Sequence, residues 1–374
     1  MTMIAADKKA FRIHQGEAAL ARLATTSNGL TPFQQAGFLA PLLRGVNALD
    51  DFRLIEIRAD GGALLLPVSI VQLGLFRLAD IAGGKQASFH AATSDGLLAI
   101  SAQTLRRHLI NAGREIGIDA FTFSDCPLTY NDRDNPLAIL ARQASPSSGW
   151  KLALEGEAEE ILARLSDRDD RKKLRQKANR LAALGTIHAG WAETPEARAA
   201  AFEALFRWKA ERFGAAGIDD PFATDAIRTS LAAMAETGVL RLFTLRAGNR
   251  LVAVLAGLVG DRCFSGMLNG HEPEAEIART SPGEQLLPHL IRALCADGFR
   301  HFDLGVGEAR YKAHYCPARI ALVDCAVAAS AKGILAARLF LAMRAAKRTI
   351  KQSPKLMELL TRLRRLRSGK PYKA

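Results

Sequence analysis

The chain has 374 residues, 49% of them apolar, and a formal net charge of +13. This length suggests two or three domains, and no apolar run reaches the ~18 residues that a membrane-spanning helix needs. The charge lies almost entirely in residues 331–374, which hold 13 Lys and Arg against one acid, so the rest of the chain is nearly neutral. With only 6% aromatic residues as well, we expect no nucleic-acid partner.

Cysteine and histidine spacing argues against a metal centre. The five cysteines form no C-x-x-C pair, and the eight histidines form no H-E-x-x-H or similar ligand spacing. We therefore expect reduced thiols and no metal. The first 22 residues lack the apolar core of a secretory signal. A cytoplasmic protein is the expectation.

In the first part of the chain, residues 1–30 are expected to be irregular. A helix is predicted to begin at Thr31, which can cap it, with Pro32 in the first helical position. Residues 60–62, Asp-Gly-Gly, indicate a turn between two strands. The elements predicted in this half are strands at 52–58, 63–73, 75–81 and 120–123, and a helix at 102–116.

A short pattern recurs in the second half of the chain. The hexapeptide L-x-x-H-L-I occurs at 105–110 and again at 286–291. Gly117 and Phe121 follow the first copy at the same offset as Gly298 and Phe302 follow the second. Because a helix, a turn and a strand repeat in the same order, the pattern favours duplication of one α/β unit.

The second half begins after a loop at 145–150. The predicted elements are helices at 155–165, 168–184, 195–213 and 282–296, and strands at 240–246, 251–259, 263–269 and 300–305. The first three strands read as an antiparallel meander. The helix at 168–184 is densely basic; we interpret it as a solvated face, with anion binding as the alternative.

The tetrapeptide Ser281-Pro282-Gly283-Glu284 marks a helix start. Ser281 and Glu284 fit a capping box, and Pro282 suits the first helical position. Unpaired N–H groups and a partial positive charge at a helix N-terminus suit a pyrophosphate, and Arg279 adds a cation. The alternative is a well-capped helix and nothing more.

The segment 303–312 follows a predicted strand directly. Gly305 and Gly307 permit unusual backbone angles there. Transfer of an acyl group to an amine needs a proton donor for the leaving thiolate and an acceptor for the amine proton. Tyr311 can donate the proton to the thiolate. Asp303, Glu308 or a water can accept the proton of the amine. The alternative is that the tyrosine and the nearby His314 only pack, which we favour for His314.

These motifs resemble a known family. The sequence S-P-G followed by G-F-x-x-F-D-L-G-x-G-E-x-x-Y-K resembles the CelD-like, cellulose-biosynthesis-associated branch of the GNAT acetyltransferase superfamily. The resemblance covers residues 165–320 well and the N-terminal half more loosely. It implies an α/β fold with mixed (α+β) sheets, built from two tandem GNAT-like domains as in Fem-type peptidoglycan aminoacyltransferases.

The resemblance also implies an acyl-CoA-dependent N-acyltransferase. The co-substrate would be acetyl-CoA or another acyl-CoA, and the acceptor an amine, such as an amino sugar or polysaccharide-related saccharide. Pantetheine would lie along Met267, Leu268 and Asn269. The pyrophosphate would meet the residues that surround the helix start: Arg279, Ser281, Gly283, Glu284 and Gln285. Gly305, Gly307 and Lys312 would contact the acceptor.

The sequence departs from the family at one place. The usual phosphate loop, Q/R-x-x-G-x-G/A, is absent, because Arg279 is followed by only one glycine, Gly283. A non-catalytic GNAT-like scaffold in exopolysaccharide or cell-envelope biosynthesis at the membrane is therefore the alternative function. An aminoacyl-tRNA in place of acyl-CoA is an open alternative for the donor.

The last part of the chain, 331–374, predicts basic amphipathic helices. Leucines recur every three to four residues after Pro354, among arginines. Such a tail can dock on the body, lie peripherally on an anionic membrane or bind an acidic partner. The expected division is an irregular segment at 1–30, GNAT-like domains at 31–150 and 151–330, and the tail at 331–374.

Overall fold

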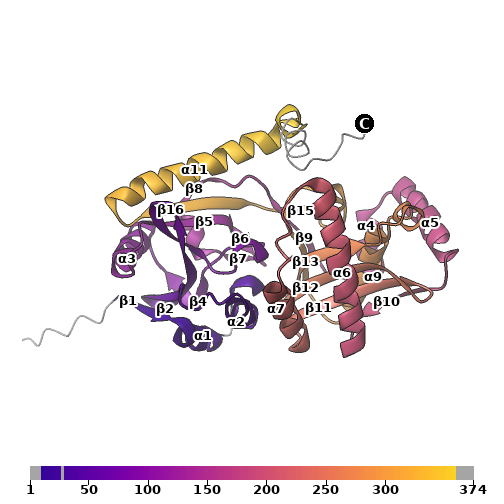
Figure 1. Cartoon of the computed structure of the whole chain (residues 1–374), viewed down its shortest axis with the longest axis horizontal. Coiled ribbons are helices and arrows are strands. Elements are labelled where there is room, and N and C mark those ends of the chain that lie inside the picture. The colour runs from indigo at the N-terminus through magenta and orange to yellow at the C-terminus, as the bar shows by residue number, and fades with distance from the viewer. Residues whose placement is uncertain (1–9, 27–28, 359–374) are drawn as a thin grey trace, which may run out of the picture. The chain divides into compact units, whose positions relative to one another are not determined.

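The computed structural model describes residues 10–26 and 29–358, and the chain divides into two compact units. Unit 1 comprises Met1–Ser147 with Ala321–Thr349, and unit 2 comprises Ser148–Ile320 with Ile350–Ala374. Within the described residues, each unit is built around one seven-stranded mixed sheet (Figure 1). The second basic helix of the predicted tail falls largely on 359–374, outside the described residues.

The sheet of unit 1 has the order β1-β2-β3-β5-β16-β8, with β4 paired to β2. Its strands are β1 (Phe11–Gln15), β2 (Phe52–Leu73), β3 (Phe76–Ile81), β4 (Thr93–Ala99), β5 (Ala120–Pro127), β8 (Ala141–Ala144) and β16 (Leu322–Ala328). Its helices are α1 (Gly16–Ala24), α2 (Ala36–Gly45), α3 (Ala102–Glu115) and most of α11 (Ala331–Gln352). A small hairpin pairs β6 (Thr129–Tyr130) with β7 (Arg133–Asp134).

The sheet of unit 2 has the order β10-β11-β12-β13-β14-β9-β15. Its strands are β9 (Gly149–Ala153), β10 (Ile187–Trp191), β11 (Leu240–Ala247), β12 (Arg250–Gly260), β13 (Cys263–His271), β14 (His301–Val306) and β15 (Ala318–Ile320). Its helices are α4 (Ala158–Leu165), α5 (Arg168–Ala182), α6 (Pro195–Ala216), α7 (Asp225–Glu236), α8 (Ala275–Ala278), α9 (Pro282–Ala296) and α10 (Arg310–Tyr315).

The two units share one connection pattern. In unit 1, α3 connects β4 to β5, and β5 pairs in parallel with β3; in unit 2, α9 precedes β14, and β14 pairs in parallel with β13. A parallel pair needs a crossover connection, which the helix provides. The helix and strand of each unit are the segments that carry the repeated hexapeptide and its following phenylalanine, as expected for a duplicated unit.

One strand, β16, joins the sheet of the opposite half of the chain. Strand β9 pairs antiparallel with β14 in unit 2, and β16, which follows unit 2 in the sequence, pairs antiparallel with β5 in unit 1. The first unit therefore receives Ala321–Thr349, which the sequence had assigned to the second domain and the tail. Strand pairing over nearly 200 residues leaves no local signal, so the boundary expected at 330 differs from the observed one after Ile320. The first segment of unit 1 ends at Ser147, a few residues from the boundary expected at 150.

Three local expectations also differ from the structure. The segment expected to be irregular at the start holds β1 and α1, which pair with and pack on β2. Thr31 caps only a short 3₁₀ turn at Pro32–Gln34, and α2 begins at Ala36. Residues 60–62 do not break β2 but form an irregularity opposite β4, where Gly61 has a φ of 85°.

Buried apolar side chains form a separate core in each unit. In unit 2, Phe264 and Phe302 of the parallel strands meet Leu287 and Ile291 of α9. In unit 1, Phe121 of β5 occupies the corresponding place with Leu105 and Leu109 of α3. Among the described residues, no helix is long and apolar enough to cross a membrane.

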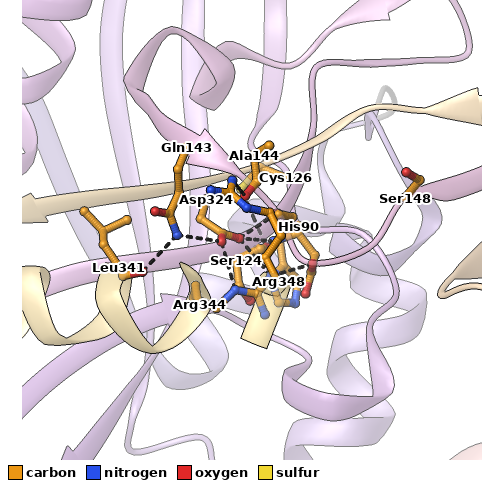
Figure 2. A network of polar contacts seen from close by, with 12 residues as sticks. His90, Ser124, Cys126, Gln143, Ala144, Ser148, Asp324, Leu341, Arg344 and Arg348 are labelled. Carbon is orange, nitrogen blue, oxygen red and sulfur yellow. Dashed lines mark hydrogen bonds and ion pairs between the residues drawn. The ribbon is translucent and has the colours of Figure 1, made fainter. Parts of the chain in front are cut away.

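Helix α11 is held to the sheet of unit 1 by a buried charge network (Figure 2). Arg344 donates to both carboxylate oxygens of Asp324, at 2.8 and 3.0 Å, and to Asp125 at 2.6 Å. Ser145 donates to Asp324 at 2.6 Å, and the Asp324 side chain is fully buried. Burial alone would raise the pKa of Asp324, but the hydrogen bonds from Arg344 and Ser145 outweigh it and lower the pKa.

We predict that Arg344→Met lowers the free energy of unfolding by ~3–5 kcal/mol, because it leaves the Asp324 carboxylate buried without its cation. Asp324 has a lowered pKa in the folded state, so its favourable contribution is present above the pKa of an unfolded aspartate. The loss should therefore be largest at neutral pH and shrink as the pH falls through the folded-state pKa. Denaturant unfolding across this pH range measures it.

Arg338→Met, on the exposed face of the same helix, is the matched control and should change stability by less than ~0.5 kcal/mol. Adding Asp324→Asn to Arg344→Met should recover part of the loss, because no buried charge then remains unpaired. An Arg344→Met protein as stable as the parent would mean that the ion pair does not hold α11 in place.

Candidate functional site

In unit 2, pairing between the parallel strands β13 and β14 stops early. They pair over three positions, Cys263↔His301, Phe264↔Phe302 and Ser265↔Asp303. Strand β13 continues to His271 beside β12, whereas β14 continues to Val306 beside β9. Among the described strands, residues 268–271 therefore have a partner on one edge only. We call this place, residues 266–271 of β13 and 304–306 of β14, the fork.

The sequence of β13 explains why the pairing stops there. Gly257 faces Gly266 and Ala256 faces Leu268, so Met267 is the extra residue of a β-bulge. A Cβ on Gly266 would lie 3.0 Å from the carbonyl oxygen of Asp303, so a glycine allows the close approach at the base of the fork. The bulge then bends the rest of β13, which leaves backbone N–H and C=O groups available on its free edge.

Asn269 and Tyr311 meet at the fork. The Asn269 side-chain amide donates to the Tyr311 hydroxyl oxygen at 3.0 Å. Burial raises the pKa of Tyr311, and the hydrogen bond from Asn269 only partly offsets it. The phenol is therefore protonated at neutral pH, and because its oxygen accepts from Asn269, its own hydrogen can be donated elsewhere. Of the other two predicted pantetheine residues, Leu268 is buried and Met267 is half-buried.

Asp303 is a structural residue rather than an accessible base. Its side chain is buried and accepts hydrogen bonds from the Ser265 hydroxyl, at 2.7 and 2.9 Å, and from the Gly305 N–H at 2.9 Å. These bonds fix the end of β14 where Gly305 adopts a φ of 68°. The geometry thus argues against the catalytic role suggested for Asp303 by the sequence.

The residues after β14 turn the chain toward α10. Gly307 has a φ of 114°, and its carbonyl accepts from the Trp150 indole at 2.9 Å. Glu308 is exposed and accepts from the backbone N–H of Ser148 at 3.2 Å. Of the two predicted carboxylate bases, only Glu308 is therefore open to solvent.

Lys312 carries its charge in an unfavourable environment. Its ammonium group donates to the Val306 carbonyl at 3.0 Å, and burial lowers its pKa to about 8, although Asp303 partly offsets this. Lys209 of α6 likewise has its pKa lowered to about 8, mainly by burial, with repulsion from Arg212 and Lys312 adding to it. Lys209 and Lys312, both with a lowered pKa, therefore lie close enough in unit 2 for their charges to repel each other.

The start of α9 differs from the predicted capping box. Ser281 has a φ of 55° and its side chain does not cap the helix; instead its hydroxyl accepts from the Lys177 ammonium at 2.8 Å. Glu284 lies 3.7 Å from the same ammonium, and the N–H groups of Glu284 and Gln285 both donate to the Ser281 carbonyl. Pro282 has no N–H, so Gly283 supplies the remaining backbone donor of this first turn.

The other two predicted residues of this group lie at the edges of the site. The Gln285 side chain is buried and donates to the Thr280 carbonyl at 2.9 Å, which is a structural contact. Arg279 is exposed at the C-terminal end of α8.

Two pockets, each of about 390 Å³, adjoin these residues. The first, the basic pocket, is lined by Ser166, Lys173, Leu174, Gln176, Lys177, Arg180, Glu284, Arg310, Tyr311, His314 and Tyr315. The second, the β13 pocket, is lined by Trp208, Lys209, Glu211, Arg212, Ala215, Asn269, Gly270, His271 and Pro273. The Asn269–Tyr311 hydrogen bond joins a residue of one pocket to a residue of the other. A hollow of about 30 Å³ also has Asn269 and Gly283 in its wall.

The contribution of α5 to the basic pocket was missed by the sequence interpretation. Lys173, Lys177 and Arg180 lie on one face of this helix because they are spaced by four and three residues. That spacing was a readable signal, but a solvated helix face has the same pattern. His314, expected only to pack, lines the same pocket and lies 3.3 Å from the Ser166 hydroxyl.

We predict that Lys312→Met raises the free energy of unfolding by ~1–3 kcal/mol at neutral pH, at ~1.4 kcal/mol per pKa unit, because the parent charges a buried lysine there. The folded-state pKa of about 8 lies below the ordinary value of 10.5, so the penalty is full below the lower value and disappears above the higher one. Thermal unfolding of both proteins at neutral and alkaline pH measures the difference. Lys172→Met, on the exposed face of α5, is the control and should show no such pH dependence.

The segment that holds the candidate site is similar to a known protein family. Residues 168–313 match the family described as "Acetyltransferase (GNAT) domain". This region extends from α5 into α10 and includes every site residue predicted from the sequence. No curated protein matches the sequence.

Several solved structures share the fold over most of their length. A conserved protein of unknown function from Bacteroides thetaiotaomicron is 13% identical, with 83% of this chain and 96% of that chain covered and a TM-score of 0.52. L-PGS from Bacillus licheniformis is 14% identical, with 87% and 95% covered and a TM-score of 0.50. FemX is 11% identical, with 85% and 95% covered and a TM-score of 0.50. The prediction of mixed α/β units in a tandem GNAT-like fold is confirmed.

Proposed function

We propose that the protein is an acyl-CoA-dependent N-acyltransferase whose reaction takes place beside the Asn269–Tyr311 pair of unit 2. The observation that carries the proposal is that this hydrogen bond, 3.0 Å long, joins residues of two separate pockets at the fork. A transferase needs such an arrangement, because two substrates must meet at one proton donor.

The acyl-CoA fits the side of the site that holds the start of α9. Pantetheine carries two amides, which can pair with the free edge of β13 as an added strand would. The diphosphate fits the Gly283 N–H and the cations of the basic pocket, because Lys173, Lys177 and Arg180 line that pocket. The acceptor amine would then enter by the β13 pocket, whose wall includes Trp208 and Glu211.

The chemistry is direct transfer. The amine nitrogen attacks the thioester carbonyl, a C–N bond forms, and the C–S bond breaks. Tyr311 gives its proton to the leaving sulfur, and its raised pKa keeps that proton available at neutral pH. The amine proton passes to water or to the exposed Glu308. The Lys312 ammonium supplies positive charge near the end of β14, where it can stabilise the developing oxyanion.

The alternative is a non-catalytic GNAT-like scaffold in exopolysaccharide or cell-envelope biosynthesis. In its favour, Glu284 stands where the GNAT phosphate loop has a small residue, and its carboxylate lies 3.7 Å from Lys177. An acid in this place opposes a diphosphate. For the acyltransferase, we further propose that it belongs to the CelD-like branch. Its acceptor would be a saccharide and its donor acetyl-CoA.

Calorimetric titration tests the donor. We expect acetyl-CoA, CoA or a longer acyl-CoA to bind the parent protein, and Gly283→Glu to abolish that binding, because a carboxylate would fill the place of the diphosphate. Gly283→Ala is the matched control: its Cβ would lie 3.5 Å from the His271 ring, an ordinary contact, so donor affinity should fall far less.

Absence of binding by any of these at millimolar concentration would favour the scaffold. If aminoacyl-tRNA alone supports transfer to an amine, the donor is that molecule and the acyl-CoA proposal fails.

Tyr311→Phe tests the chemistry. Removal of the hydroxyl should lower kcat by ~10²-fold or more with little change in donor affinity, because a proton donor acts on the transition state. Tyr130→Phe removes the same atom from a buried tyrosine of unit 1 and should leave kcat unchanged. Equal turnover by the Tyr311→Phe protein and the parent would exclude Tyr311 as the acid.

A further inference from the structure

Helix α11 presents four large apolar side chains to solvent, whereas its Arg344 side chain is largely buried against the protein. Its large exposed residues are Ile334, Leu335, Leu339 and Met343, with 49%, 54%, 45% and 57% of their surfaces accessible. The residues buried in this helix are Gly333 and Ala336. An ordinary surface helix has the reverse arrangement, with its apolar stripe against the core.

The rotation of α11 about its axis is fixed by contacts on its inner face. A Cβ on Gly333 would lie 1.7 Å from the Asp119 carbonyl oxygen, so the helix begins directly against the backbone. Three turns later on the same face, Arg344 donates to Asp324. Near it, the Gln143 side chain donates to the Leu341 carbonyl at 3.0 Å. Turning the leucines inward would break the buried ion pair. The exposed stripe therefore belongs to the native packing.

The charges of α11 are of one sign. Residues 331–352 contain six Lys and Arg and no acid. Arg338 lies beside Leu335 and Leu339 on the outer face, and Lys347 follows one turn after Met343; both cations are exposed. Figure 1 shows α11 as one long helix beside β8 and β16 of unit 1.

We propose that the exposed side chains of α11, at residues 334, 335, 338, 339, 343 and 347, dock on the surface of an anionic lipid bilayer. Apolar side chains enter the boundary between headgroups and acyl chains, and the flanking cations attract anionic headgroups. A second copy of this chain is a poorer occupant, because pairing the stripe with itself places cations against cations. The proposal is independent of the acyl-transfer reaction.

The test is flotation of the full chain with two kinds of vesicle, phosphatidylcholine alone and phosphatidylcholine with phosphatidylglycerol. We expect binding to the anionic vesicles only, and weaker binding as salt rises, because the screening length falls to ~10 Å at 0.1 M. Leu335→Glu with Leu339→Glu, and separately Arg338→Glu with Lys347→Glu, should each weaken binding by about tenfold or more. All four residues are exposed, so thermal unfolding should be unchanged.

Each double substitution has a matched control. Leu73→Glu with Leu75→Glu changes two other exposed leucines of unit 1, with 55% and 81% of their surfaces accessible. Lys172→Glu with Arg175→Glu makes the same charge change on the exposed face of α5. Neither control should alter vesicle binding by more than a small factor.

Four outcomes would overturn the proposal. Equal binding to both vesicle types would remove the anionic surface as the partner. Binding that survives both α11 double substitutions but is lost when residues 359–374 are deleted would assign it to that segment. Equal losses in the controls would indicate unspecific adhesion. A dimer that dissociates on Leu335→Glu with Leu339→Glu, without vesicle binding, would make a second copy the occupant.

Discussion

The early end of pairing between β13 and β14 is the constraint on which the candidate site depends. Gly266 allows the strands to approach at Asp303, and the bulge at Met267 then turns the rest of β13 away from a strand partner. Asp303 is buried at the same point, where it holds the Gly305 turn. The free edge of β13, the Asn269–Tyr311 hydrogen bond and the start of α9 all lie around this place. If β13 paired with β14 over its whole length, it would have no free edge.

Unit 1 contains a comparable divergence that the chain uses differently. Strands β3 and β5 pair only at Leu78↔Ala120 and Ala79↔Phe121. Beyond them lie groups that are charged or polar: burial raises the pKa of Asp80 to about 6, and Asp125, at a φ of 52°, binds Arg344. Charge pairing and hydrogen bonds thus occupy the place of unit 1 that corresponds to the fork. One unit thus has a strand with a free edge at this place, and the other has a network that holds α11.

Two partly buried lysine ammonium groups lower the stability of unit 2. Lys209 and Lys312 are both held at a pKa of about 8, chiefly by burial, so that ammonium groups near the fork are partly desolvated. Electrostatic groups act more strongly in such surroundings than in water. The apolar outer face of α11 is a similar exception to the usual burial pattern. Departures of this kind concentrate where a protein binds or reacts.

Sequence alone determined most elements of this protein, their order and the repeat, because helix periodicity, caps and strand patterns act over a few residues. The helix predicted at 282–296 has those bounds in the structure, and the strand predicted at 120–123 lies within β5. The sequence also predicted Tyr311 as a proton donor from its own segment, and Asn269 as a pantetheine contact through a family resemblance. Only the tertiary structure decided that β9 and β16 join the sheets they do, that Asp303 is structural, that Lys177 binds Ser281, and which side of α11 faces solvent. These depend on contacts between residues up to 219 positions apart, such as Asp125 with Arg344, for which a local pattern carries no information.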